Sequence, residues 1–454
     1  MKRSAWRYLW SAQDIRRKLL ITLGILVLYR LFAQVPVPGV DREAVSAAFT
    51  SGTAGGNLLN TINLISGGTL QNFSVLAMGV YPYITAQIIL QLLVPIVPAF
   101  KARMEDDQRE GKKWMERWTY YLAIPMAAIQ AFAQINLFGI ALGGGGAGII
   151  PDFGFGGDAN VLGSITILFV MTAGTMFAIW LGELISEFGI RNQGLSLIIF
   201  AGIITQIPGN FGRVLSGSGD SLPFVLTFLI VLTLLMIFVI VYVQQGRRNV
   251  PVMYPGRRMG NRMSMPVKGT LPLMVNMAGM IPIIFANAIL QFPAIIASFF
   301  AGSETVWLAN LSASVTSLFD TGGASYGYIY FFMVVIFAFF YTTVLFEQQN
   351  YGENLKRVGA QIPGVSRGAP TQRYLGKVLR RITLVGAVFL GLVAVMPYLV
   401  PLVVPTLAFG GGNVGLLLVS SSGLLIVVGV IRDTFFNIDA ELKLHGYDES
   451  LLVR

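Results

Sequence analysis

One uncharged stretch of the chain is long enough to cross a lipid bilayer: Leu271-Pro-Leu-Met-Val-Asn-Met-Ala-Gly-Met-Ile-Pro-Ile-Ile-Phe-Ala-Asn-Ala-Ile-Leu-Gln-Phe-Pro293, which continues apolar to Phe300. About 20 apolar residues span the ~30 Å hydrocarbon core of a membrane. Two residues interrupt the stretch, because Pro282 removes a backbone donor and Gly279 allows another backbone to come close. In lipid, such a break requires protein or a water-filled cavity around the freed backbone groups. We therefore expect an interrupted span that packs against one or the other.

The composition places the whole chain in the membrane class. Of its 454 residues, 54% are hydrophobic and only 12% are charged. There is no cysteine, which excludes disulfides and thiol chemistry, and the single histidine, His445, lies in a polar tail. Membrane proteases and metal sites need histidine, paired carboxylates or cysteine, and the apolar segments offer none of these. We expect no enzymatic activity, no catalytic residue, no metal and no cofactor.

Ten apolar segments, uncharged apart from Arg30 in the first, predict ten membrane spans. They cover residues 19–35, 73–98, 118–142, 161–181, 194–208, 222–243, 271–300, 326–346, 382–403 and 414–431. The fifth is short for a full crossing. The first is too long for the apolar part of a signal peptide and ends in Val35-Pro-Val-Pro-Gly39 instead of a cleavage site, so it is predicted to be an uncleaved span that tolerates Arg30 by snorkelling.

The basic residues mark one side of the membrane. If both termini share a side, that side holds twenty-nine of the 32 lysines and arginines, and the opposite side holds only Arg42 and Arg213. Lysine and arginine accumulate in cytoplasmic loops. The asymmetry predicts an even number of spans and a multi-pass protein of the cytoplasmic (inner) membrane with both termini in the cytoplasm.

The uncharged segment 57–72 is half apolar and too polar for a lipid-facing span. It predicts a re-entrant segment at the membrane interface. The segments before and after residue 213 are alike in outline, since the second span of each set is long and interrupted by a proline, Pro82 or Pro282. Matching interrupted spans indicate a repeat with the working site between the halves. Because five is an odd number of spans, the second half starts on the opposite side of the membrane and must be inverted. We predict halves at 1–213 and 214–431, with cytoplasmic loops 244–270 and 347–381, and a cytoplasmic tail at 432–454.

The spans carry amides and hydroxyls instead of charges. These residues are Thr85, Gln87, Gln91, Gln130, Gln134, Asn136, Asn276, Asn287 and Gln291. Each one taken singly is explained by hydrogen bonds between helices. An ion-coupled transporter usually has carboxylates or histidines at mid-membrane. A secondary transporter of a small solute and a scaffold or insertase without a through-pore nevertheless remain alternatives at this point.

The basic loops have two interpretations. They can set the orientation and contact anionic lipid, which is worth about 1 kcal/mol per residue near the surface. They can also dock an acidic or RNA-bearing partner, for which Tyr254 with Arg257, Arg258 and Arg262 offers a cationic, partly aromatic surface. The length of the loop 347–381 favours docking.

Four segments resemble one protein family. They are Asn63 to Gln91, Ser196-Leu-Ile-Ile-Phe-Ala-Gly-Ile-Ile204, Val275-Asn-Met-Ala-Gly-Met-Ile-Pro-Ile-Ile-Phe-Ala286 and Leu424-Leu-Ile-Val-Val-Gly-Val-Ile431. The chain resembles the SecY family, the central channel subunit of the bacterial Sec protein translocase. The resemblance implies an all-α polytopic membrane protein with ten transmembrane helices in two inverted five-helix halves around a central pore with a plug segment.

The resemblance also implies roles for particular residues. A pore ring is expected at Val80, Ile84, Leu195, Ile199, Ile284 and Ile426. A plug at about 57–72 includes Leu58, Leu59, Ile62, Leu64 and Ile65. A lateral gate is expected at Thr85, Gln91, Asn287 and Phe292. Partner docking is expected at Arg247, Arg248, Arg257, Arg258, Arg262 and Arg367, the last displaced by one position from the family pattern.

The expected function follows from that resemblance. It is a passive protein-conducting channel that translocates unfolded secretory polypeptides and releases transmembrane segments laterally into the bilayer. The expected partners are the SecE and SecG subunits, the SecA motor and the ribosome on the cytoplasmic loops with contact to ribosomal RNA, signal peptides and nascent chains, and membrane lipid.

Overall fold

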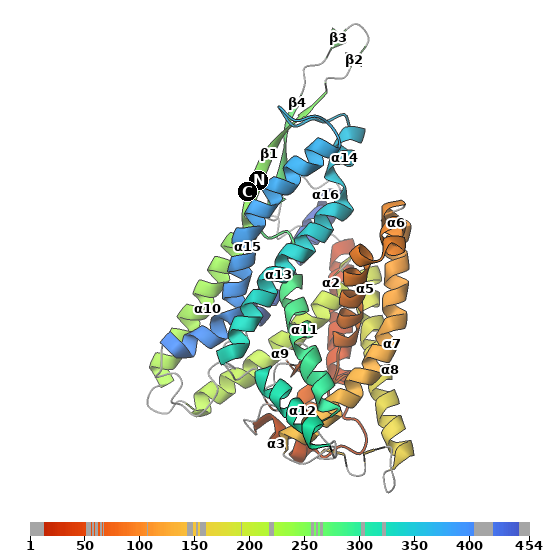
Figure 1. Cartoon of the computed structure of the whole chain (residues 1–454). Helices are drawn as coiled ribbons and strands as arrows, with labels where there is room; N and C mark the ends of the chain where they lie inside the picture. The colour runs from red at the N-terminus through yellow and green to blue at the C-terminus, as the bar shows by residue number, and fades with distance from the viewer. Residues whose placement is uncertain are drawn as a thin grey trace.

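Long apolar helices make up most of the computed structural model, and a β-hairpin projects from one end of the helical bundle (Figure 1). The structure describes residues 13–50, 56, 59, 62–63, 66, 68–106, 108–142, 149–150, 153–154, 160–191, 193–217, 222–255, 258–259, 262–263, 267–300, 305–319, 324–403 and 421–444.

Helices make up most of the described part of the first half of the chain. Its elements are α2 (Gln13–Phe32), α3 (Arg42–Thr50), the 3-10 turn η1 (Leu70–Asn72), α5 (Tyr81–Ile96), α6 (Pro98–Asp106), α7 (Gln108–Ala141), α8 (Val161–Phe188) and α9 (Gly194–Gly217). The predicted division after residue 213 falls inside α9.

The second half adds the hairpin to its helices. Its elements are α10 (Leu222–Gln245), β1 (Arg247–Tyr254), β2 (Arg258–Met259), β3 (Arg262–Met263), β4 (Val267–Met274), α11 (Ile281–Ser298), α12 (Val306–Leu318), α13 (Ala324–Gln349), α14 (Tyr351–Arg357), α15 (Ala369–Val403) and α16 (Ser421–Leu444). The helix α16 continues well into the predicted tail.

Each of the ten predicted segments overlaps a helix, although not every helix is long and apolar enough to cross a membrane alone. Among the described residues, α7, α8, α10, α13 and α15 meet that test, and α5 joins them if it counts as one span with α6 across a 98° bend. The helices α9, α11 and α12 are apolar but shorter. The all-α polytopic class agrees with these helices, and the count of ten crossings remains a prediction.

The interrupted spans are built differently from the prediction. Pro82 and Pro282 do not break helices, because each lies in the first turn, at the second residue of α5 and of α11. A proline there removes a donor that has no partner within the helix in any case. Residues 73–80 form turns, and 271–274 belong to β4. The apolar runs therefore contain a turn or a strand before the helix starts, which hydropathy alone does not distinguish from helix.

Glycine precedes both of these helices at the same spacing, in Gly79-Val-Tyr-Pro82 and Gly279-Met-Ile-Pro282. Both glycines have positive φ, +52° and +64°, which side-chain-bearing residues rarely adopt. Among the described residues, a Cβ at Gly279 would meet nothing within 4 Å, so the predicted close approach is not seen there. A Cβ at Gly79 would lie 2.6 Å from the carbonyl oxygen of Ser66. Thus the two helices begin alike, but only the first is pressed against another segment.

The basic loop after α10 is a hairpin, a feature that the sequence analysis did not predict. The strands β1 and β4 pair antiparallel from Arg247–Met274 to Tyr254–Val267. Met253 and Gln361 exchange two backbone hydrogen bonds of 2.8 and 2.9 Å, which tie the hairpin to the other long basic loop. Val250, Leu273 and Ile362 share one apolar cluster there. The two basic loops therefore form a single body.

Two apolar clusters fill the bundle. A central cluster joins side chains from α2, α5, α8, α9, α10, α11, α13, α15 and α16. A second cluster, nearer the end opposite the hairpin, joins α3, the segment around Ile62 and Phe73, α7, α8 and Ala294 of α11. The outer faces are apolar too, since Leu234, Phe238 and Tyr242 of α10 are exposed. A helix that is apolar all round belongs in a core or a membrane.

Candidate functional site

The six residues predicted to form a ring meet in the central cluster, although they are far apart in sequence. Val80 precedes α5, and the other five lie on α5, α9, α11 and α16. Five of the six are buried, and Leu195 is half-buried at the edge of the cluster, against Gly182 of α8. Aliphatic side chains from both halves of the chain thus share one central apolar cluster, and their role as a ring stays a prediction. Such a collar excludes ions by dewetting and yields to side chains of different shapes.

The local sequence explains how α5 presents its two members of this set. Val80 is the residue before the first turn and Ile84 follows one turn later, so both lie on one face of the helix. Leu195 and Ile199 repeat this spacing at the start of α9. Each helix therefore supplies a pair of aliphatic side chains from its first turns.

The plug segment lies inside the protein. Leu59 and Ile62 are buried in the second cluster, while Leu58, Leu64 and Ile65 lie outside the described residues. The backbone of Asn63 accepts a hydrogen bond from Gln206 Nε2 of α9 at 3.2 Å. The described part of this half-apolar segment thus buries its apolar side chains with those of α3, α7 and α8, and its location at the membrane interface stays a prediction.

The end of the plug segment is fixed against the start of α5. The hydroxyl of Thr69 lies 3.1 Å from the carbonyl of Ser66 and 3.2 Å from that of Ala77. The carbonyl of Ser66 also faces Gly79, where no Cβ fits. The plug segment and the first member of the ring, Val80, are thus neighbours through Gly79.

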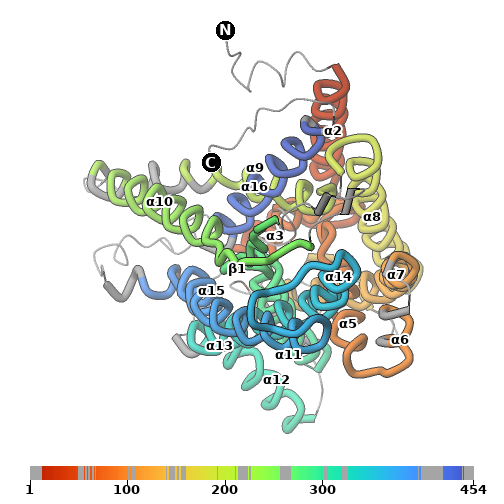
Figure 2. The backbone as a smooth tube through the Cα atoms, turned by 90° about the horizontal axis from the view of Figure 1, so that it is seen from above, coloured from red at the N-terminus to blue at the C-terminus, as the bar shows by residue number. Residues whose placement is uncertain are grey.

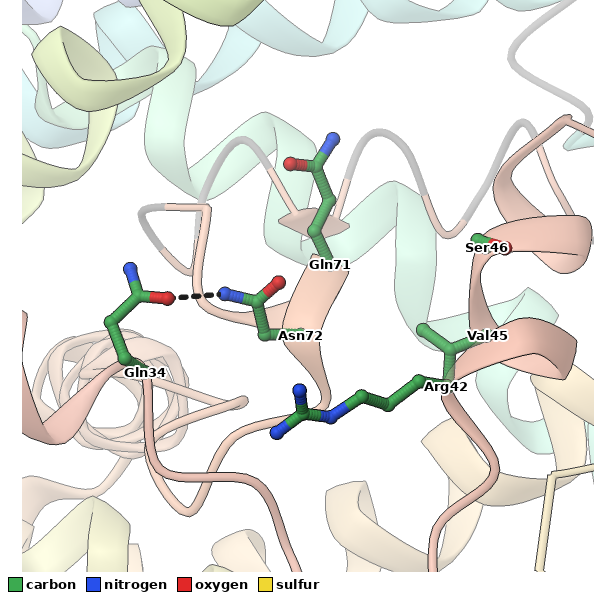
Figure 3. Close-up of a pocket in the computed structure, with 6 residues that line it drawn as sticks. All are labelled: Gln34, Arg42, Val45, Ser46, Gln71 and Asn72. Atoms are coloured by element: carbon green, nitrogen blue, oxygen red, sulfur yellow. Dashed lines mark hydrogen bonds between the residues drawn. The ribbon is translucent and has the colours of Figure 1, made fainter.

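A polar cavity of about 220 Å³ lies beside the plug segment, at the same end of the bundle (Figure 3). Its lining residues are Gln34, Arg42, Val45, Ser46, Gln71 and Asn72. Asn72 donates a hydrogen bond to Gln34 at 2.9 Å, and the Gln71 backbone donates one to Asn63 at 3.2 Å. The plug segment is therefore tied to the outer end of α2 as well as to α9.

The residues predicted for a lateral gate lie on α5 and α11, which contact each other. Thr85, Gln91 and Asn287 are buried, and Phe292 is exposed. Gln130 of α7 donates to the Thr85 hydroxyl at 2.9 Å, and Asn287 donates to the hydroxyl of Tyr330 on α13 at 2.8 Å. Each of these two bonds joins helices of the same half.

Apolar side chains contact each other across the halves at this seam. Phe132 of α7 stacks on Phe299, next to the end of α11, with ring centroids 5.2 Å apart. Ala294 of α11 belongs to the second cluster with side chains of α7. Contacts of this kind have no directional bonds to break when helices separate.

The predicted docking residues cluster on the hairpin and near it. Arg247 and Arg248 are exposed on β1, and Arg247 lies 5.8 Å from the ring centroid of Phe436. The backbones of Arg258 and Arg262 belong to the short pair β2–β3, while Arg257 lies outside the described residues. Arg367 is exposed in the turn before α15. The hairpin carries these charges away from the bundle (Figure 1).

Two features were missed or misjudged from the sequence. Arg30 does not only snorkel, because it donates to the carbonyl of Ala201 on α9 at 2.6 Å. The helix α12 was not predicted at all, although its apolar residues are visible in the sequence. It is too short for a span, and a search for spans passes over it.

Comparison with known proteins agrees with this architecture. The sequence model of the SecY family matches residues 74–435. The chain belongs to the SecY family. The SecY-family protein translocase subunit of Mycobacterium tuberculosis is 38% identical over 442 residues, covering 96% of both chains. That of Streptomyces coelicolor is 35% identical, covering 98% of this chain and 99% of the other.

Solved structures share the fold of this SecY-family chain. A structure described as a protein conducting channel has a TM-score of 0.59 at 17% identity, covering 96% of this chain and 93% of that one. Sec61 in the canine ribosome–channel complex from the endoplasmic reticulum has a TM-score of 0.57 at 18% identity, with the same coverage. The predicted family and fold class are confirmed. Family membership makes the chain a membrane-embedded protein-translocation channel and sets the small-solute transporter aside.

Proposed function

We propose that the protein conducts unfolded secretory polypeptides across the bacterial cytoplasmic membrane through the waist formed by the six aliphatic residues, and releases transmembrane segments sideways. The observation that carries the proposal is the meeting of Ile84, Ile199 and Ile284 with their three counterparts in one cluster between the halves 1–213 and 214–431. The plug segment, beside Val80, would close this route in the resting channel.

Lateral release needs a seam between the halves that can open. The side chains between α5 and α11 are suited to such opening. Thr85 and Asn287 are hydrogen-bonded within their own halves, and Phe132 stacks on Phe299 across the halves. A segment of about 20 apolar residues gains free energy by leaving the wet pore for hydrocarbon, whereas each charge at the membrane centre costs about 3 kcal/mol. Opening the seam therefore lets a passing segment partition by its own hydrophobicity.

The hairpin is the proposed docking surface on the cytoplasmic side, with both termini on that side. Its exposed basic side chains and its rigid connection to Gln361 suit a large anionic partner. We propose that the SecA motor and the ribosome, with its RNA, bind there, and that SecE and SecG complete the channel.

Crosslinking to a stalled chain tests the conducting route. A photoreactive residue at Ile84 or Ile284 should crosslink to a secretory chain arrested in transit. The matched control is Leu234 on the exposed face of α10, which should label lipid only. Equal crosslinking from Leu234 and Ile284 would refute the route through the waist.

Charge reversal tests the docking surface. Arg257→Glu with Arg258→Glu should weaken binding of both the motor and ribosomes to vesicles containing the channel, with the folded channel retained. Arg42→Glu, on the opposite end of the molecule, is the control and should leave binding unchanged. Undiminished binding of both partners to the double variant would end the docking proposal.

A further inference from the structure

The helix α12 follows α11 at the end of the bundle opposite the hairpin (Figure 1). Its 13 residues extend only about 20 Å at 1.5 Å per residue, less than the ~30 Å hydrocarbon core. It carries no charged residue. The helix is therefore too short to be a span and has no charged face toward water.

The burial of α12 is the reverse of that in a water-soluble helix. Ser312 and Thr316 are 2% and 7% exposed, and Ser312 donates to the carbonyl of Ala297 on α11 at 2.7 Å. The apolar Val306 and Trp307 are 72% and 67% exposed. In water, a helix packs its apolar side chains inward and leaves serine and threonine outside. The surroundings of α12 are therefore apolar on at least one side.

The exposed residues of α12 fall on adjoining sides of the helix. At 100° per residue, Trp307, Leu311 and Leu318 share one side. The exposed polar residues Asn310 and Ser317 lie about 60° and 80° around the helix from Trp307, with Ser314 at the boundary and Val306 beyond them. With its third side against α11, the helix presents one apolar and one polar edge. This arrangement fits the boundary between hydrocarbon and water.

The apolar edge continues an apolar surface that already belongs to the membrane region. Ile296, Phe299 and Phe300, at the end of α11, are also exposed. Seen along the bundle, α12 projects from the perimeter beyond α11 and α13 (Figure 2). A side chain at this position projects away from the bundle, toward the medium that surrounds it.

We propose that α12 lies in the membrane interface, with Trp307, Leu311 and Leu318 in the lipid and Asn310 and Ser317 in the headgroup water, and that it holds the end of α11 at that depth. The side of the membrane on which α12 lies, the outer leaflet, rests on the proposed function. The amphipathic indole of tryptophan favours the headgroup level. The ligand is the lipid surface itself, without preference for anionic headgroups because α12 has no charge.

Fluorescence quenching of the full-length protein in phosphatidylcholine vesicles tests the proposal. Trp307 is retained as the single tryptophan after Trp6, Trp10, Trp114, Trp118 and Trp180 are replaced by phenylalanine. Lipids brominated near the headgroup should quench it at least about twofold more than lipids brominated near the chain ends, as expected for an interfacial residue. Aqueous acrylamide should quench it weakly. The result should not change when anionic lipid is added.

The matched control moves the probe to the polar edge by combining Trp307→Phe with Ser317→Trp in the same background. This probe should be quenched strongly by acrylamide and weakly by brominated lipid. Strong acrylamide quenching of Trp307 would overturn the proposal, and so would protection from both quenchers, since protein would then cover the face.

If the variant with five tryptophans replaced does not fold, the emission of Trp307 is obtained by subtracting the fluorescence of Trp307→Phe from that of the unaltered protein. The same quenching results then support or overturn the proposal. The measurement does not depend on translocation, so a failure of the channel function and a failure of the lipid contact are distinguishable.

Discussion

The two seams between the halves of the molecule are held together in different ways. At the front seam, α11 meets α5 and α7 through apolar contacts and the stack of Phe132 on Phe299. At the back seam, Lys18 of α2 forms an ion pair with Glu441 of α16, and Asn437 donates to the carbonyl of Arg191 at 3.3 Å. Figure 2 shows α16 beside α2 and α9, across the bundle from α11. We therefore predict that the halves separate at the front seam and stay together at the back seam.

Covalent closure of the seams tests this difference most strongly. The chain has no cysteine, so introduced thiols react alone. Joining Phe132→Cys to Phe299→Cys with a short bifunctional thiol reagent should lower translocation at least about tenfold, because opening requires rigid-body separation of the halves.

Joining Lys18→Cys to Glu441→Cys in the same way should leave most of the translocation of a preprotein into vesicles. Each single-cysteine variant treated with the reagent serves as the control. Equal inhibition by the two crosslinks would contradict a one-sided opening.

The waist at which both seams meet should lose its seal when it becomes polar. Ile284→Asn is expected to raise ion leakage through the resting channel about tenfold, because a polar collar no longer dewets. Leu234→Asn, on the lipid-facing side of α10, should not raise it. Conductance of planar bilayers measures both, and a tight Ile284→Asn channel would show that the ring does not form the seal.

The glycines that precede α5 and α11 allow a second comparison between the two halves. Gly79→Ala should lower the free energy of unfolding by about 2–4 kcal/mol, because positive φ and the clash with Ser66 both oppose a Cβ. Gly279→Ala should cost about 1–2 kcal/mol, since only its backbone conformation opposes a side chain. Chemical denaturation in detergent measures the difference, and the prediction is wrong if the two variants are equally stable.

The back seam should respond least to a single substitution. The side chains of Lys18 and Glu441 are 29% and 21% exposed, so water and salt screen their attraction. Lys18→Gln is expected to cost about 0.5–1 kcal/mol, as partly exposed ion pairs do. The loss should shrink in high salt when unfolding is followed by denaturation. A loss that is independent of salt would mean that Lys18 contributes by packing instead.

Much of the fold could be predicted from the sequence, because hydropathy and basic residues are local signals. The apolar segments each contain a helix, and the motifs around Ile84, Ile199, Ile284 and Ile426 pointed to residues that do meet. The exact starts of α5 and α11 could not be predicted, since turns, a strand and a helix in apolar surroundings have the same hydropathy. The hairpin was missed because its strands are basic and its pairing joins residues far apart in the loop.

The sequence by itself determined that the chain is a membrane protein, which of its loops are basic and which aliphatic residues were expected at the waist. Only the tertiary structure decided that Thr85 and Asn287 are bonded within their own halves, that the carbonyl of Ser66 packs against Gly79, and that α12 turns apolar residues outward. The physical reason is that hydrophobicity is a property of each residue, whereas the partner of a hydrogen bond and the direction of a helix face depend on which segments pack together.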